Sequence, residues 1–99
     1  MMSDSLTPVT VGPVLMDGGV ADAVIAAIRE RNSDVLVVPH GSYHRVLVPH
    51  RCVVSRSDVE HHLGRSVSFP GDLEMIMSSF KGEFSVHEDR AEWIGRQST

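Results

Sequence analysis

Histidine is the residue type in this sequence best suited to chemistry, because a neutral imidazole binds metals and exchanges protons near neutral pH. The chain has six histidines: His40, His44, His50, His61, His62 and His87. None of them forms a pair four residues apart on one helix face, and no cysteine or carboxylate completes a recognisable set of ligands. We therefore expect no structural or catalytic metal and no organic cofactor.

Other candidate nucleophiles and phosphate-binding sequences are equally incomplete. Ser55 and Ser57 lack the Gly-x-Ser-x-Gly setting of a hydrolase nucleophile, and Gly18-Gly19 lacks the lysine and further glycines of a phosphate loop. Cys52 lies between Arg51 and Val53, a setting typical of a thiol in a buried strand. Thirteen acidic residues are scattered along the chain. A pair of them acting in acid–base catalysis remains an open alternative.

The composition limits the class of protein. Ninety-nine residues make one domain, and a chain of this size can bury a single core without disulfides or metals. The formal charge of −4 argues against nucleic-acid binding, which usually requires a basic surface. The single cysteine fits a reducing compartment, and no apolar run suggests a leader peptide or a membrane span. We expect a cytoplasmic protein without membrane contact.

The longest periodic segment, residues 17–32, predicts an amphipathic helix. Asp17 is expected to cap its N-terminus, and Asn32 to end it. The apolar residues cover roughly half of the helix circumference, which is wider than packing on a sheet alone requires. A second surface must therefore cover this helix. We favour a segment of the same chain over another protein.

The strands are expected in short runs around this helix. Residues 9–15 contain Gly12-Pro13, so this strand is predicted to lie at a sheet edge or to be bulged there. The β-branched run 35–38 is typical of a strand covered on both faces, and it begins a hairpin that ends at residue 48. Further strands are expected at 51–54 and in a final hairpin at 83–94.

The second half is expected to contain one short helix. The sequence from Ser55 to Asp58 resembles a capping box, the helix continues to Leu63, and Gly64 is its C-terminal cap. Residues 66–77 are expected to be irregular and partly extended, with a turn at Pro70-Gly71. Residues 78–82 are expected to form a loop.

The predicted fold is a single α+β domain at residues 9–95, with flexible tails at 1–8 and 96–99. Each half runs strand, helix, strand, strand. The long helix is expected to pack on a mostly antiparallel sheet that includes both hairpins.

Several segments in this order resemble the small effector proteins of bacterial multicomponent monooxygenases. They are a glycine and proline pair in the first strand, the long helix, the first hairpin turn, the capped helix, and a Ser-Ser-Phe run: residues 11–14, 22–28, 41–45, 55–65 and 76–82. The resemblance covers about residues 9 to 95, and the short N-terminal segment is similar to the toluene, phenol and alkene monooxygenase branch.

This resemblance implies a non-catalytic protein without a cofactor, monomeric when free. Such effectors bind the hydroxylase component, whose large subunit carries a diiron centre, and tune substrate access, oxygen activation and coupling. Two alternatives stay open. One is a small enzyme that uses the histidines and carboxylates, and the other is a generic ferredoxin-like interaction module.

The resemblance also implies a contact site. The run Ser78-Ser79-Phe80 corresponds to the family's loop near the route to the diiron centre, and Ile76 and Asn32 complete the expected interface. Small hydroxyl side chains at Ser78 and Ser79 allow two backbones to approach closely. Phe80 is either an interface anchor or a core residue, and we favour the core.

Overall fold

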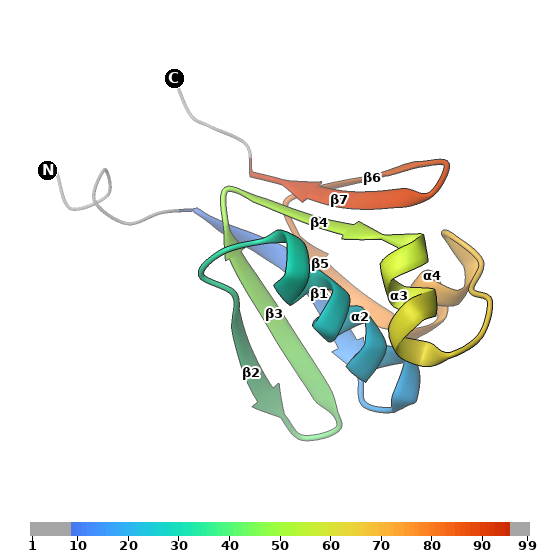
Figure 1. The fold of residues 1–99 in the computed structure, drawn as a ribbon. Helices are drawn as coiled ribbons and strands as arrows, with labels where there is room; N and C mark the ends of the chain where they lie inside the picture. Colours follow the sequence, from blue (N-terminus) through green and yellow to red (C-terminus); the bar gives the residue numbers. More distant parts are fainter. Residues whose placement is uncertain (1–8, 96–99) are drawn as a thin grey trace, which may run out of the picture.

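The computed structural model describes residues 9–95, so the expected tails at 1–8 and 96–99 lie outside the described residues. The elements in chain order are β1 (Thr10–Met16), α2 (Gly19–Arg31), β2 (Leu36–His40), β3 (Tyr43–Pro49), β4 (Arg51–Ser55), α3 (Arg56–Leu63), α4 (Gly71–Ile76), β5 (Met77–Lys81), β6 (Glu83–His87) and β7 (Arg90–Ile94). Every strand pairing within 9–95 is antiparallel. Figure 1 shows the mixed helices and strands of the predicted α+β class.

The strands form two sheets rather than one. A four-stranded sheet has the order β2-β3-β1-β5, and a three-stranded sheet has the order β4-β7-β6. Both predicted hairpins are present, as β2–β3 and β6–β7, but they belong to different sheets. The expectation that one sheet includes both hairpins was wrong, because β5 occupies the free side of β1 while the final hairpin pairs with β4 in a second sheet.

Strand β1 lies inside its sheet, so the edge position predicted from Pro13 is wrong. Residues of β1 pair with β3 both before and after Gly12-Pro13. Gly12 has φ +143, and a Cβ there would lie 2.3 Å from the Val46 carbonyl oxygen, so only glycine fits. The predicted bulge does occur close by, because the register with β5 shifts between Val14 and Leu15.

Strand β2 is an exposed edge, which contradicts the expected cover on both faces. Among the strands of residues 9–95, it pairs with β3 alone. Leu36 is 56% exposed and Val38 39% exposed. Helix α2 lies against one face of the four-stranded sheet in Figure 1, and no described element covers the other. A β-branched run therefore does not establish burial on both sides.

Helix α2 supplies one side of the core, and the same chain covers its wide apolar arc, as predicted. Its buried residues are Ala21, Ala23, Val24, Ala27 and Ile28. They belong to one cluster with inward residues of both sheets, such as Leu15, Val46 and Trp93. Helix α3 and strand β4 pack against α2. Burial of this many apolar side chains is the main source of stability.

Four helix ends were predicted, and Asn32 does end α2 as its C-cap. Gly18 is the N-cap of α2, while the side chain of Asp17 binds His44 instead. Ser55 is the N-cap residue of α3, as predicted, but its hydroxyl makes no capping hydrogen bond and lies 3.0 Å from that of Ser57. Gly64 does cap α3 in the left-handed conformation, with φ 80.

Residues 66–82 are more ordered than expected. Residues 71–76 form helix α4, where irregular or extended chain was predicted, and 77–81 form strand β5, where a loop was predicted. The turn into α4 is closed by Asp72, whose carboxylate accepts from the Ser68 N–H at 2.9 Å while its own N–H donates to the Ser68 carbonyl at 3.0 Å. Strand β5 has weak intrinsic propensity and forms by pairing with β1.

Candidate functional site

The α4–β5 segment, residues 71–81, exposes large apolar side chains at the end of a sheet. Met75 is 78% exposed and Phe80 is 45% exposed. Strand β5 is an edge of the four-stranded sheet. Met75 was not among the predicted site residues, because residues 66–77 were expected to be irregular and partly extended. Exposed apolar residues at a sheet edge are typical of a protein interface.

The two predicted serines lie at a bulge in β5. Ser79 pairs with Val14 and Met77 pairs with Leu15, so Ser78 is the extra residue between them. Both serines are exposed, and the Ser78 hydroxyl is 3.5 Å from the Val14 carbonyl oxygen. A bulge changes the direction of a side chain and is common beside functional sites.

Phe80 is not a core residue, so that expectation was wrong. Its ring lies 5.6 Å from the Phe84 ring, which in turn lies 5.2 Å from buried Trp93. Phe84 separates Phe80 from the core, which leaves almost half of the Phe80 side chain open. Ile76 is partly buried and packs against the core at the end of α4.

Asn32 lies away from this segment, at the end of α2 against β4. Its amide donates to the Ile28 carbonyl at 2.6 Å and to the Val53 carbonyl at 2.8 Å, and its side-chain oxygen accepts from the Val53 N–H at 3.0 Å. Asn32 thus hydrogen-bonds to the open side of β4 as a neighbouring strand would. The structure does not bring it together with Ser78, Ser79 and Phe80.

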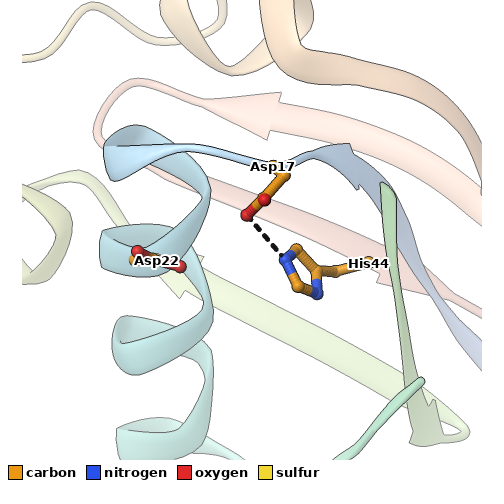
Figure 2. Close-up of side chains that lie close together, drawn as sticks. All are labelled: Asp17, Asp22 and His44. Carbon is orange, nitrogen blue, oxygen red and sulfur yellow. Dashed lines mark hydrogen bonds and ion pairs between the residues drawn. The ribbon is translucent and has the colours of Figure 1, made fainter. Parts of the chain in front are cut away.

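One group of metal-ligating types does assemble. Asp17, Asp22 and His44 each offer a ligand atom, and these atoms lie within 4.8 Å of one another (Figure 2). His44 Nε2 lies 2.9 Å from an Asp17 oxygen, and this hydrogen bond lowers the pKa of Asp17. The group could not be seen in the sequence because its members come from three separate places, the β1–α2 turn, α2 and β3. Asp17 and His44 already hydrogen-bond to each other, and this contact joins the β1–α2 turn to β3.

The polar groove beside α2 contains charges that pair within the chain. Its volume is about 720 Å³, and it lies between α2, β4 and the β6–β7 turn. Arg31 binds Asp58 and lowers its pKa, and Arg51 lies 2.8 Å from Glu92 and lowers the pKa of that carboxyl.

Cys52 is also unsuited to catalysis. It is fully buried, and burial raises the pKa of its thiol to about 12. A thiol in that state is not a nucleophile at neutral pH. Among residues 9–95, no helix is long and apolar enough to cross a membrane.

Comparisons with known proteins agree with the sequence resemblance. The model of the MmoB/DmpM family matches residues 9–94. The effector subunit of the alkene monooxygenase system of Xanthobacter autotrophicus (strain ATCC BAA-1158 / Py2) is 37% identical over 92 residues, covering 91% of this chain and 90% of that protein.

Two solved structures share the fold. Both are phenol hydroxylase–regulatory protein complexes, and the matching chains have TM-scores of 0.76 and 0.72 at 20% and 24% identity. The matches cover 88% and 86% of this chain, and 98% of each matched chain.

The family match spans almost all of the described structure, and it favours an effector over the small enzyme and the generic ferredoxin-like module. The chain belongs to the MmoB/DmpM family, whose members are effector or regulatory proteins of monooxygenase systems and not their catalytic components.

Proposed function

We propose that this protein binds the diiron hydroxylase component of a multicomponent monooxygenase and tunes its substrate access, oxygen activation and coupling. The observation that carries this proposal is the 37% identity to an effector subunit over nine-tenths of both chains. The fold shared with regulatory proteins of phenol hydroxylase supports it. We also propose that this protein works in the cytoplasm and is a monomer when free.

An effector of this kind needs no catalytic group of its own. It changes the hydroxylase by binding one conformation more tightly than another, and a tenfold difference in affinity corresponds to about 1.4 kcal/mol of bias. The requirements on its surface are therefore shape, exposed apolar area and correctly placed polar groups. The α4–β5 segment meets these requirements.

In the proposed complex, Met75 and Phe80, which precede and follow the serine pair in the chain, are apolar anchors. Both side chains are exposed in the free protein, so they gain contacts on binding without any local unfolding of the protein. Ser78 and Ser79 allow close approach and hydrogen-bond to the partner or to bound water. Ile76 packs against the core and so holds the junction between α4 and β5 in place. Asn32 contributes by holding the end of α2 against β4.

A titration tests the effector role itself. The protein is added to its hydroxylase, reductase and ferredoxin while product formation and NADH use are measured. Product formation and coupling should rise to an optimum near one effector per hydroxylase active site. Unchanged turnover and coupling across the whole titration would show that the effector assignment is wrong.

A double substitution tests the segment. Ser78→Leu with Ser79→Leu should raise the concentration needed for half-maximal activation by about tenfold, because bulky side chains prevent close approach. The matched control is Ser57→Leu with Ser66→Leu, which changes two other exposed serines. Both variants should melt near the wild-type temperature. Equal activation by the two variants would exclude the serine pair from the interface.

A further inference from the structure

The four-stranded sheet has a second face that carries apolar residues and that no element within residues 9–95 covers. We call it the outer face and define it by residues that point away from α2: Met16, Leu36, Val38, Tyr43, Arg45 and Ser79. Side chains alternate between faces along β3, where Val46 and Val48 are buried while Tyr43 and Arg45 are exposed. The apolar side chains of the outer face are between 37% and 56% exposed.

The register joins these residues into one surface. Val38 lies opposite Arg45, Arg45 opposite Val14, and Val14 opposite Ser79, so one row crosses all four strands. Directly opposed residues on one sheet face have side chains in contact range. Met16 and Tyr43 form the next row toward the α4–β5 segment. Ser79 therefore joins the outer face to the proposed hydroxylase contact at the β5 edge, whereas Phe80, which lies opposite buried Pro13, is on the other face of that strand.

Arg45 stands in the middle of this apolar surface, between Val38 and Val14 in the row that crosses the sheet. No acidic side chain within residues 9–95 forms an ion pair with it, whereas Arg31 and Arg51 both have carboxylate partners. Arginine is one of the residue types that contribute most to protein interfaces, since its guanidinium binds a carboxylate with two hydrogen bonds. An exposed arginine among apolar side chains is complementary to an apolar surface that contains an acidic residue.

The α4–β5 segment has fewer residues than a stable protein interface needs. Its helix has six residues and its strand five. A stable protein interface uses roughly 20–30 residues on each side. The segment alone is too small, and the outer face is the adjoining exposed apolar surface.

We propose that the outer face is the second part of the hydroxylase-binding surface, and that the hydroxylase presents to it an apolar patch with a carboxylate for Arg45. This inference rests on the proposed function. The partner covers Leu36 and Val38 at the β2 edge and Met16 and Tyr43 beside the α4–β5 segment. Binding therefore buries the side of the sheet that α2 leaves open.

A matched pair of substitutions tests the apolar part. Val38→Lys places a charge on the outer face, and Ile94→Lys places the same charge on β7 in the other sheet. The two positions are each 39% exposed in the free protein, so the substitutions should have similar effects on folding. Val38→Lys should raise the Kd for the hydroxylase by about tenfold or more, and Ile94→Lys by less than about twofold.

A charge reversal tests the carboxylate. Arg45→Glu should weaken hydroxylase binding by about tenfold or more, and Arg45→Met, which keeps much of the apolar stem, should weaken it less. Binding is measured by fluorescence titration of labelled hydroxylase with each folded variant. If wild-type protein binds but Val38→Lys and Arg45→Glu bind as tightly as Ile94→Lys, the outer face is not part of the interface.

Two further outcomes separate this inference from its alternatives. Sedimentation of the free protein reports self-association. A wild-type dimer that Val38→Lys dissociates, with no change in hydroxylase affinity, would assign the face to a second copy and overturn the inference. A wild-type protein that neither binds nor activates the hydroxylase would overturn the proposed function, and this inference with it.

Discussion

The two faces of the four-stranded sheet have similar apolar residues but opposite surroundings. On the inner face, Leu15 and Val46 are fully buried beneath α2 and the second sheet. On the outer face, Leu36 and Val38 keep 56% and 39% of their surface exposed. The contrast shows that residue type alone does not define the core. What differs is whether an element within residues 9–95 covers the face, and the face that these elements leave open is available to a partner.

Removing the same side chain from each face should give the largest difference. Leu15→Ala should lower the free energy of unfolding by about 2–5 kcal/mol, because it removes buried contacts and leaves a cavity. Leu36→Ala should change it by about 0.5 kcal/mol or less, because the side chain is mostly in water already. Urea unfolding followed by circular dichroism measures both. A similar loss for the two variants would contradict the assignment of the faces.

Substitution of Asn32 tests the hydrogen bonds that join the end of α2 to β4. Asn32→Ala deletes the hydrogen bonds to Ile28 and Val53, and we expect a loss of about 1–3 kcal/mol in unfolding free energy. Its effect on hydroxylase Kd should be smaller than that of Val38→Lys. Asn32→Asp is the informative control, because it can accept from the Val53 N–H but cannot donate to either carbonyl. Wild-type stability in both variants would show that the hydrogen bonds to Val53 are not formed.

The smallest expected effect on stability comes from removing the ion pair between Glu92 and Arg51, and this effect depends on pH. Arg51 lowers the pKa of Glu92 below its ordinary value of 4.5, so the pairing stabilises the folded protein above that pH. Its contribution is lost as the pH falls through the lower pKa of the folded state. The stability difference between wild type and Glu92→Gln should therefore shrink as the pH falls below about 4.5.

Arg45 on the outer face is the control for this pH dependence. Because no acid within residues 9–95 pairs with it, Arg45→Gln should give no stability difference that changes over the same pH range. Thermal melts at a series of pH values compare the two variants. A constant difference for Glu92→Gln, or a pH-dependent one for Arg45→Gln, would contradict the assignment of paired and unpaired charges.

Much of the fold could be predicted from local patterns. Helix α2 has a strong apolar period, both hairpins are bounded by turn residues, and Gly64 is a standard left-handed cap. The errors came from features that depend on distant partners. Strand β5 forms because β1 has a free side, and β2 is exposed because no element covers its outer face. Asp17 was misassigned because His44, 27 positions away, binds its carboxylate.

The candidate site was predicted by resemblance more than by physical pattern. The small hydroxyl side chains of Ser78 and Ser79 are common in exposed segments and only weakly indicate an interface, and the bulge that exposes them appears only once β1 and β5 are paired. Phe80 and Met75 could be distinguished from core residues only by exposure in the folded chain. Arg45 was passed over because its position on an open apolar face depends on the register of three strands.

Hydroxyl-radical footprinting of the hydroxylase complex tests the central claim most directly. It reports side-chain exposure at oxidisable residues on both sides of the molecule. Binding should slow oxidation of Met16 and Met75, while His61 and His62 on α3 should react as fast as in the free protein. Protection of the α3 histidines with unchanged oxidation of the two methionines would place the hydroxylase on the opposite side and contradict the account.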